Sequence, residues 1–420
     1  LPKCPISAVA SGAPTMAPRP FTASENAPVA ATPQQIDTTA YICVRDLATL
    51  DEWISKAEAA GTIAFDTETD ALSSANAGLV GVSLAVAPGQ ACYIPLAHRQ
   101  GEGLLLEAPE ALDQIPMDQA LARLKPLLEN PAVLKVGQNA KYDLAVLSRY
   151  GITVGPIDDT MLISYVLEGG LHGHGMDELS KLHLGHEPIP FKKVAGVGKA
   201  QKSFKHVALK PATAYAAEDA DVTLRLWRIL KPRLAEEGLT TVYETLERGM
   251  PAVLADMERA GIRVDPDRLK RLSSEFGLRM AELEAQAHQI AGHPFNIGSP
   301  KQIGDILFGE LNLPGGKKTA SGQWGTDASV LEDLAQNHPL PRTILDWRQL
   351  SKLKGTYTDA LVAAMDPQTN RVHTSYQLAA ATTGRLASSD PNLQNIPIRT
   401  EEGARIRRAF VAEPGHVLMS

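Results

Sequence analysis

Apolar and polar positions divide the chain into a first part with strand signals and a second part that is mainly helical. Short apolar runs at 63–65, 79–86 and 91–95 are typical of strands, and Pro88-Gly89 predicts a turn between the last two. Because the connections are short, we expect these three strands to form an antiparallel meander. A further strand is predicted at 132–136.

Helical periodicity follows the first strands. It predicts helices at 117–128, 141–150, 176–184 and 212–235, and a Gly/Lys-rich loop at 192–205. Strands followed and surrounded by helices predict an α/β domain over residues 39–237. Residues 1–38 are rich in Ala, Pro, Ser and Thr, which predicts a disordered linker.

Beyond Gly238 the signals are mostly helical. Residues 241–260 and 265–290 are expected to form two antiparallel amphipathic helices that turn at Gly261. Further helices are predicted at 299–310, 327–336 and 341–365, and strands at 371–377 and 417–420. The second region is therefore expected to be a mostly α-helical domain over 238–420.

Composition is that of an ordinary globular protein, with 44% hydrophobic and 21% charged residues among 420. No run in the sequence approaches the eighteen or so apolar residues that a membrane span needs. The cysteines at 4, 43 and 92 are far apart, which favours a reducing compartment over a disulfide framework or a zinc ribbon. The net charge of −7 is uneven, because 342–408 holds ten Lys/Arg against six Asp/Glu, and this predicts parts with different roles.

Candidate chemistry begins where the strand at 63–65 breaks into acids. The period of two places Asp66 and Glu68 on one face, with Phe65 and Thr67 on the other. Two carboxylates at such a short distance raise each other's pKa, and a hard divalent cation is their natural partner. The alternative is a pair of solvated turn acids after an edge strand.

Three further residues favour a metal site. Asp143 lies in the first turn of a helix that follows a strand, and Tyr215 and Asp219 are four apart on one helical face. If the sheet brings these helices over the first strand, four carboxylates gather with a tyrosine at their rim. Four acids can hold two Mg²⁺ or Mn²⁺ ions, an arrangement used in phosphodiester cleavage.

Residues 65–70 (Phe-Asp-Thr-Glu-Thr-Asp), 137–143 (Gly-Gln-Asn-Ala-Lys-Tyr-Asp) and 215–221 (Tyr-Ala-Ala-Glu-Asp-Ala-Asp) resemble the three exonuclease motifs of the bacterial DNA polymerase I family, or family A DNA polymerases. They occur in the family's order and at similar spacing. The resemblance implies a ribonuclease-H-like fold and hydrolysis of mispaired nucleotides from a DNA 3′ end.

The resemblance also implies roles for the acids and the tyrosine. Asp66 would bridge both metals, Glu68 and Asp219 would complete the first metal, and Asp143 would hold the second through water. Tyr215 would orient the attacking water.

Other residues match family positions that grip or wedge the terminal nucleotides of the single-stranded 3′ end: Leu72, Gln138, Asn139 and Tyr142. For Leu72 and Tyr142, plain core packing is an equally open alternative.

The second region resembles the same family. Residues 295–302 and 350–358 are similar to its polymerase thumb, and 383–386 with 390–397 to the start of its palm. A basic, hydroxyl-rich segment can meet the phosphates of a primer-template duplex without reading its sequence. The DNA-binding candidates are Lys352, Lys354, Thr356, Tyr357 and Thr358 in the thumb, and Arg385, Asn392 and Gln394, which match minor-groove contacts, in the palm.

Arg399, Arg405, Arg407 and Arg408 are expected to form a solvated helical face. In the family, the strand begun by 417–420 carries the first polymerase metal-binding Asp just beyond this point. Both ends of the chain are expected to be cuts in a longer protein, so polymerase activity is expected of the parent and not of this piece. We expect a bacterial, cytoplasmic and nucleoid-associated monomer that binds DNA and no membrane.

Two motifs suggest other chemistry, and two rival functions remain open. His172, His174, His183 and His186 suggest zinc, but no Cys joins them and their spacing fits no common zinc site. Residues 315–319 resemble the end of a phosphate loop, but Lys stands where Ser or Thr should follow Gly-Lys, which favours a thumb loop. The rival functions are a DNA-binding module with a vestigial nuclease site and a ribonuclease-D-like RNA exonuclease.

Overall fold

The computed structural model describes residues 36–99, 112–319 and 322–419. Most of the predicted linker over 1–38 lies outside these ranges, as does Cys4. Its last residues are described: Ile36 is buried against the second core defined below, and Asp37 caps the short 3₁₀ helix η1 (Thr38–Ala40). Among the helices in these ranges, none is both long and apolar enough to cross a membrane.

A mixed sheet lies at the centre of the first part of the molecule. Within the described residues it has six strands in the order β1-β4-β3-β2-β5-β6. Their bounds are β1 Ile42–Cys43, β2 Thr62–Thr69, β3 Leu79–Ala87, β4 Gln90–Pro95, β5 Leu134–Gly137 and β6 Ile157–Asp159. Strands β2, β3 and β4 pair antiparallel, which confirms the predicted meander, whereas β5 joins β2 in parallel.

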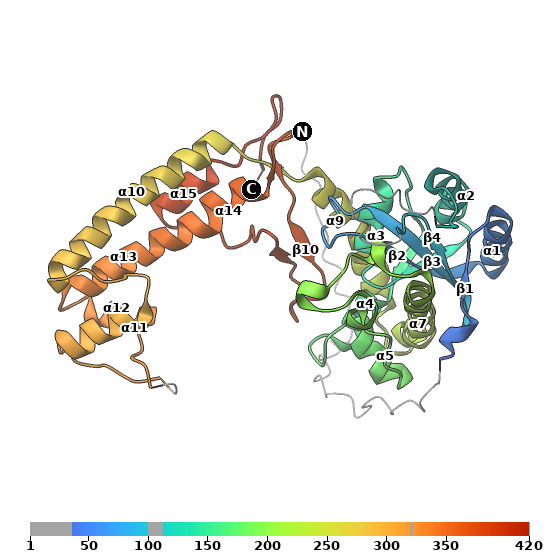
Figure 1. Ribbon diagram of the computed structural model, residues 1–420, viewed down its shortest axis with the longest axis horizontal. Helices are drawn as coiled ribbons and strands as arrows, with labels where there is room; N and C mark the ends of the chain where they lie inside the picture. Colours follow the sequence, from blue (N-terminus) through green and yellow to red (C-terminus); the bar gives the residue numbers. More distant parts are fainter. Residues whose placement is uncertain (1–35, 100–111, 320–321, 420) are drawn as a thin grey trace, which may run out of the picture.

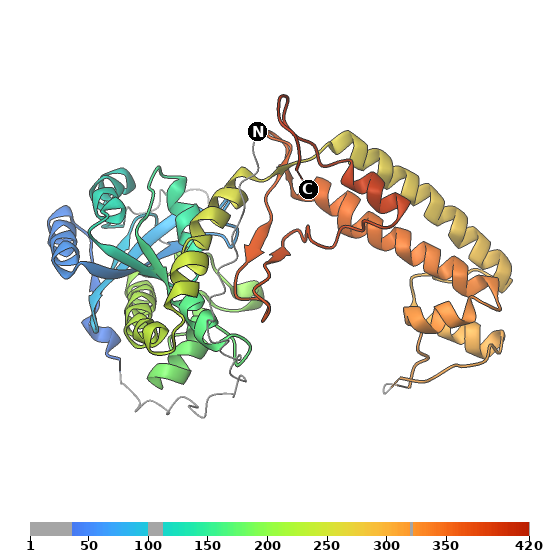
Figure 2. The same ribbon diagram turned by 180° about the vertical axis from the view of Figure 1, so that it is seen from behind.

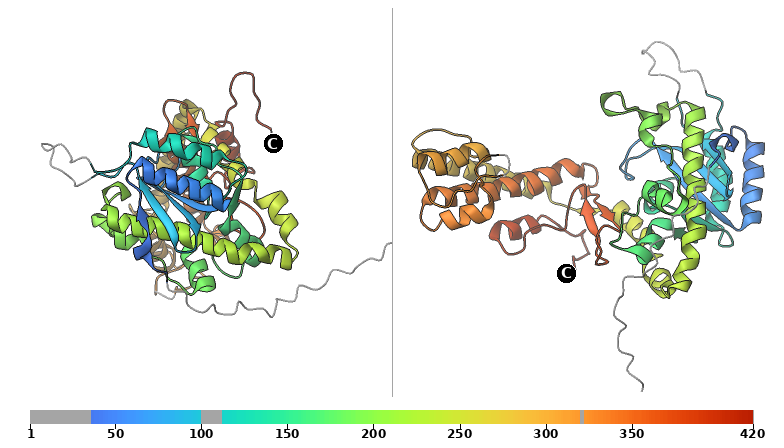
Figure 3. Two further views of the ribbon diagram at one scale, coloured as in Figure 1. Left: turned by 90° about the vertical axis from the view of Figure 1, so that its right-hand side faces the viewer. Right: turned by 90° about the horizontal axis from the view of Figure 1, so that it is seen from below.

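Helices cover both faces of this sheet (Figure 3, left view). On one face lie α1 (Leu47–Ala60), α2 (Met117–Glu129) and α3 (Lys141–Ser148), and on the other α4 (Thr160–Glu168), α5 (Met176–Leu184) and α7 (Leu209–Glu236). Short pieces precede α7: α6 (Phe191–Ala195), η2 (Gly198–Ala200) and η3 (Phe204–His206). They occupy the segment predicted to be a Gly/Lys-rich loop.

Strand β2 separates two hydrophobic cores. Its Ile63 and Phe65 belong to the first core with α1, α2 and α3, while Ala64 belongs to the second core with α4, α5 and α7. The period of two therefore directs Asp66 and Glu68 to the side of α7. Asp66 and Glu68 therefore lie at the end of β2, beyond Ile63, Ala64 and Phe65, which pack into the two cores.

The segment after α7 stays with the first part of the molecule. It comprises α8 (Thr240–Val242), the π-helix η4 (Tyr243–Glu247) and α9 (Met250–Ala260). Helix α9 packs against α3, and the buried Lys141 of α3 forms an ion pair with the buried Glu258 of α9. This packing lies beyond 237, where the sequence predicts the end of the first domain, and the boundary itself stays a prediction.

An elongated arm extends from the first part (Figures 1 and 2). Its long helix α10 (Pro266–Ala291) packs against α13 (Pro339–Leu353) and not against α9. The predicted antiparallel pairing of 241–260 with 265–290 is therefore wrong. Strand β7 (Ile262–Arg263) separates the two helices, and the apolar face of each finds a different partner.

The remaining elements build the tip and base of the arm. The helical ones are α11 (Pro300–Gly304), η5 (Asp305–Glu310), α12 (Ala328–Leu334), η6 (Lys354–Asp359), α14 (Ala360–Ala364) and α15 (Glu401–Arg407). The strands are β8 (Met365–Asp366), β9 (Arg371–Val372), β10 (Ser375–Gln377) and β11 (Ala387–Ser389).

Two strand predictions at this base need correction. Residues 371–377 split into β9, which pairs with β7 and β8, and β10, which pairs with β11. Residues 417–419 form no strand, and their side chains are exposed, because no segment in the described part of the chain pairs with them.

Candidate active site

Three carboxylates converge at the end of β2. Ligand atoms of Asp66, Glu68 and Asp219 all lie within 4.8 Å of one another. The first two come from one face of β2, and Asp219 comes from α7, which crosses that face. Glu68 and Asp219 are buried, with 7% and 5% of their surface exposed.

Asp143 approaches from the opposite face of the sheet. It lies in the first turn of α3, and its Oδ1 accepts a hydrogen bond of 3.0 Å from the backbone N–H of Thr67. The Thr67 hydroxyl donates to the same oxygen. Asp143 is thus a neighbour of the three converging acids, held in place by the residue between Asp66 and Glu68.

Burial raises the pKa of all four carboxyl groups well above their ordinary values, and nearby negative charges raise it further. For Asp66 the cause is burial and then the charge of Asp219; for Glu68 it is burial and then the charge of Asp66. The same effect of burial dominates at Asp143 and Asp219. Oε1 of Glu68 is buried and has no hydrogen-bond partner within the described residues. A cation would relieve both the repulsion and the unpaired oxygen.

The donor set fits a hard divalent cation. Mg²⁺ and Mn²⁺ prefer carboxylate oxygens as ligands, whereas softer metals prefer nitrogen and sulfur. Among the described residues, this is the one group of three neighbouring carboxylates that could hold a metal ion.

Tyr215 stands beside this cluster, one helical turn before Asp219 on α7. Its ring packs against Phe191 and Phe204, with centroid distances of 5.9 and 5.8 Å. Burial, followed by the charge of Asp219, raises the pKa of the phenol far above its usual value. The hydroxyl therefore stays neutral and can donate a hydrogen bond at neutral pH.

Leu72 and Tyr142 lie at the rim of the site. Leu72 is 99% exposed, which excludes the alternative that it packs in the core. The Tyr142 hydroxyl lies 2.6 Å from Oγ1 of Thr69 and 2.7 Å from the carbonyl oxygen of Ala71, so it supports the loop that carries Leu72.

Gln138 and Asn139 follow β5, but their surroundings differ. The Gln138 amide donates to the carbonyl oxygen of His174 at 2.8 Å and accepts from the Thr160 hydroxyl, which occupies both of its polar atoms. Asn139 is exposed and has a left-handed backbone with φ of 56°. Asp159, at the N-cap of α4, accepts the backbone N–H of Asn139 at 3.1 Å.

Some residues at the site were missed in the sequence. Ser83 of β3 pairs directly with Asp66, and its hydroxyl is buried without a partner among the described residues. A serine in the apolar run 79–86 was the available signal. Lys205 reaches Asp70 at 3.5 Å, which joins the Lys-rich loop to the end of β2, a contact that local periodicity cannot reveal.

The DNA-binding candidates of the arm divide into exposed and buried residues. In the segment 352–358, Lys352 and Thr356 are exposed, and Lys354 pairs with Asp359 at 2.6 Å. By contrast, Tyr357 and Thr358 are buried. Their hydroxyls donate to backbone carbonyl oxygens, so neither lies on an accessible surface of the arm.

The candidates on either side of β11 are all exposed: Arg385 before the strand, and Asn392 and Gln394 after it. The Gln394 amide donates to the carbonyl oxygen of Leu386 at 2.5 Å, and the Gln394 N–H donates to Oδ1 of Asn392 at 2.9 Å. These contacts fix the two side chains against their own loop.

Of the four arginines predicted to form a solvated face, Arg399, Arg407 and Arg408 are exposed, and Arg405 of α15 is half-buried. Arg405 and Arg408 line a cavity of about 310 Å³ together with Arg268 and Arg271 of α10. Arg405 pairs with Glu275 in the same place.

Comparisons with known proteins cover most of the chain. The family described as 3'-5' exonuclease matches residues 41–235, and the family described as DNA polymerase family A matches residues 266–420. Together with the mixed sheet flanked by helices and the helix-rich arm, these matches confirm the predicted fold class.

Curated relatives are similar over nearly the whole chain. The DNA polymerase I of Rhizobium leguminosarum is 58% identical over 394 residues, which cover 91% of this chain and 39% of the relative. The DNA polymerase I of Pseudomonas aeruginosa is 49% identical over 396 residues, with 93% and 42% covered. The chain thus spans about two fifths of the length of these relatives.

A solved structure resembles the chain as well. The POL domain of Pol1 from M. smegmatis, in complex with DNA primer-template and dNTP, aligns with a TM-score of 0.73 and 29% sequence identity. The alignment covers 89% of this chain and 59% of that one.

Proposed function

Since the chain belongs to DNA polymerase family A and includes a 3'-5' exonuclease domain, we propose that it removes nucleotides from the 3′ end of DNA at the acid cluster on β2 and α7. The observation that carries the proposal is the convergence of Asp66, Glu68 and Asp219 within 4.8 Å. Their raised pKa values support a site built for cations, because an uncompensated cluster of this kind destabilises the fold.

The four acids would hold two divalent cations, Mg²⁺ or Mn²⁺. Asp66, Glu68 and Asp219, whose ligand atoms converge, would hold the cations together with the neighbouring Asp143. When bound, such a pair of cations activates water and stabilises the leaving oxygen of a phosphodiester. Thr67 keeps the Asp143 carboxylate oriented by donating two hydrogen bonds to one of its oxygens.

Tyr215 would orient the water that attacks the phosphorus. Its raised pKa keeps the phenol protonated, so it acts as a hydrogen-bond partner and not as a base. The rings of Phe191 and Phe204 hold the tyrosine ring in a fixed place. Fixed orientation is what allows one hydrogen bond to favour the reacting geometry.

The single-stranded 3′ end would be gripped at the rim. Leu72 offers a fully exposed apolar side chain, and Tyr142 holds its loop, which supports a wedge between the terminal bases. Asn139 is exposed and can contact the strand directly, whereas the bonded amide of Gln138 supports a role in positioning the segment before α3.

The arm would bind the primer-template duplex. Lys352 and Thr356 are exposed for contacts with phosphates, and Arg385, Asn392 and Gln394 are exposed near the base of the arm. We propose that the nuclease unit spans 39–237 and the partial polymerase unit 238–420, with α9 packed on the first and connecting it to the second.

Metal-dependent release of nucleoside monophosphates from single-stranded DNA tests the proposal. We expect the full chain to degrade a 3′-labelled oligonucleotide with Mg²⁺ or Mn²⁺ and to stop when a chelator is added. Asp66→Ala should lower the rate by at least about 100-fold. Loss of a residue that only supports a metal ligand costs up to about 100-fold in activity, and Asp66 would be a ligand itself. Asp118→Asn, at an exposed acid of α2, is the matched control and should leave the rate unchanged.

Three results would contradict the proposal or redirect it. Activity that survives the chelator, or an unchanged rate in Asp66→Ala, would refute the mechanism. Duplex binding without nucleotide release would favour a DNA-binding module with a vestigial site. Faster degradation of an RNA oligonucleotide of the same sequence would favour an RNA exonuclease.

A further inference from the structure

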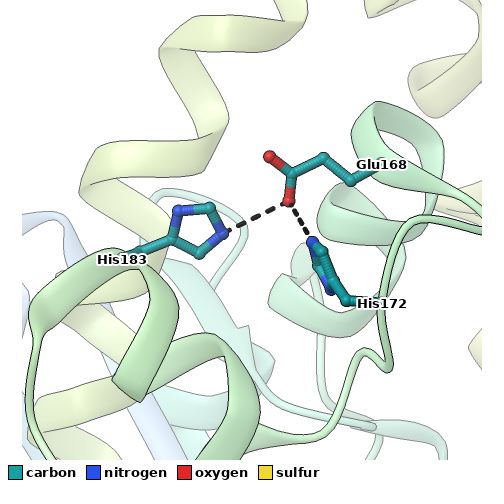
Figure 4. A group of neighbouring side chains, drawn as sticks. All are labelled: Glu168, His172 and His183. Carbon is teal, nitrogen blue, oxygen red and sulfur yellow. Dashed lines mark hydrogen bonds and ion pairs between the residues drawn. The ribbon is translucent and has the colours of Figure 1, made fainter. Parts of the chain in front are cut away.

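A second cluster of metal-ligand side chains lies apart from the acid cluster. Glu168 ends α4, His172 lies in the loop that follows, and His183 lies on α5 (Figure 4). Both imidazoles point toward one oxygen of Glu168, and ligand atoms of the three residues lie within 4.8 Å of one another. All three side chains are largely buried, with 5%, 15% and 4% exposed.

The contact between His172 and Glu168 favours a cation. Nδ1 of His172 lies 2.7 Å from the carbonyl oxygen of Gly173, which can only accept, so Nδ1 carries a proton. A neutral His172 therefore has its lone pair on Nε2, which faces Oε2 of Glu168 at 2.8 Å. Two acceptors this close repel each other unless a second proton or a metal ion lies at the contact.

His183 makes the case for a metal ion stronger. Its Nε2 lies 3.3 Å from the same oxygen of Glu168, but it makes no well-aligned hydrogen bond to any residue that the structure describes. An unpaired polar atom that is fully buried is costly. One metal ion between the three side chains would satisfy both nitrogens and the carboxylate oxygen at once.

We propose that Glu168, His172 and His183 bind a zinc ion, with water in the fourth position. Ligand atoms about 2.0–2.2 Å from a tetrahedral zinc are roughly 3.3 Å apart. The pair of Glu168 and His183 already has this separation of 3.3 Å, and the pair of Glu168 and His172, at 2.8 Å, would widen by about half an ångström on binding. Two imidazole nitrogens and one carboxylate oxygen suit zinc and not Mg²⁺, which prefers oxygen ligands throughout.

The surrounding groups match those that support a zinc site. The Gly173 carbonyl fixes the His172 ring, and Nη1 of Arg233 binds Oε1 of Glu168 at 2.7 Å, which leaves Oε2 for the metal. Carbonyl and charged partners of this kind commonly orient metal ligands. The spacing of the histidines in the sequence disfavours zinc, because it does not reveal that Glu168 lies beside His172 and His183.

The other two histidines of the sequence cluster have different partners. Nδ1 of His174 lies 2.8 Å from the Ser164 hydroxyl, and Nε2 of His186 lies 2.9 Å from Glu218. The site therefore uses two of the four histidines and one acid.

The zinc ion would fix the loop on which the arm docks. Tyr165 of α4 packs edge-on against His174, and its hydroxyl donates to the carbonyl oxygen of Ala381 and accepts from the N–H of Gly384. Both contacts join the α/β part to the segment between β10 and β11, which lies beside α4 in Figure 1. A metal ion that ties α4 to α5 would stabilise this junction.

Zinc stoichiometry of the full chain tests the proposal. The chain is stripped with a chelator and titrated with Zn²⁺ in excess Mg²⁺, which competes for the acid cluster but not for imidazole nitrogens. We expect the wild-type chain to bind one zinc ion. His172→Gln and His183→Gln should each bind zinc at least about 100-fold more weakly and so lose it. Substitution of Co²⁺ for zinc should produce the visible absorption of a four-coordinate ion, and the same variants should abolish it.

His293→Gln is the matched control. Nε2 of His293 lies 2.8 Å from Glu310, the same separation as in the pair of His172 and Glu168, but at an exposed position and outside any group of metal ligands found among the described residues. This variant should keep the zinc. Equal zinc content in wild type, His172→Gln and His183→Gln would overturn the proposal, as would absence of zinc from all of them. His172 lies in a loop, so its variant provides the answer even if His183→Gln fails to fold.

Discussion

Neutralising one acid of the cluster should stabilise the chain when no metal is present. In Asp66→Asn, the side chain keeps its shape but loses the charge that repels Glu68 and Asp219. Two full charges 4.8 Å apart repel by about 3.5 kcal/mol at an effective dielectric constant of about 20. Uptake of protons by the wild-type cluster relieves part of this repulsion, so we expect a gain of about 1–3 kcal/mol near pH 8.

The sign of the pH dependence follows from the raised pKa values. Below the ordinary values of 3.8 for Asp and 4.5 for Glu, the acids are protonated in both the folded and the unfolded chain, and the variant has no advantage. Above them the unfolded chain ionises freely, whereas the folded cluster resists. The free energy of unfolding of the metal-free wild type therefore falls as pH rises toward the folded pKa values, and the advantage of Asp66→Asn grows.

Thermal unfolding in a chelator, measured between about pH 4 and pH 8, is the assay. A gain of 1 kcal/mol raises Tm by about 2–4 °C for a domain of this size, so the variant should unfold roughly 2–12 °C higher at the alkaline end. Addition of Mn²⁺ at 100 times its Kd should stabilise the wild type by about 2.7 kcal/mol and the variant by less.

The control is Glu52→Gln, which removes an exposed acid of α1 and should shift Tm little at any pH. A variant Asp66→Asn that is no more stable than wild type at the alkaline end would refute the reasoning. An advantage that is largest in acid would refute it equally.

Two further predictions concern the junction and the rim. Glu258→Ala leaves the buried Lys141 unpaired and removes the acceptor of the Tyr376 N–H, so urea unfolding should show a loss of about 3–5 kcal/mol in the free energy of unfolding. The control Glu282→Ala, in an exposed pair with Arg279, should cost at most about 1 kcal/mol. Leu72→Ala should leave stability unchanged, because the side chain is exposed. It should weaken binding of single-stranded DNA several-fold, measured by fluorescence titration in the presence of Ca²⁺. Unchanged binding would show that Leu72 does not grip the strand.

Much of the local structure follows from the sequence. The apolar run and alternating acids of β2, the turn at Pro88-Gly89 and the helix 176–184 lie where the pattern predicts them. These features depend on residues two to four positions apart, and the chain satisfies them wherever the element is finally placed. The positions of Asp66 and Glu68 on one face are of this kind.

Placement between elements could not be predicted in the same way. The apolar faces of α9 and α10 look suited to each other, but α9 packs on α3 and α10 on α13. Burial of single residues shows the same limit, since Leu72 is exposed and Tyr357 is buried although both match family positions for contacts with DNA. An apolar or aromatic side chain has no preferred partner until the fold supplies a surface.

The sequence by itself determined which residues can carry the chemistry: the acids on β2, the pair Tyr215 and Asp219 on α7, and the family to which the motifs belong. Only the tertiary structure decided that Asp143 reaches the site from the opposite face and that His172 and His183 meet at Glu168. The physical reason is range. Periodicity acts over a few residues, whereas a cluster of charges or ligands depends on distances between segments that only the packed core sets.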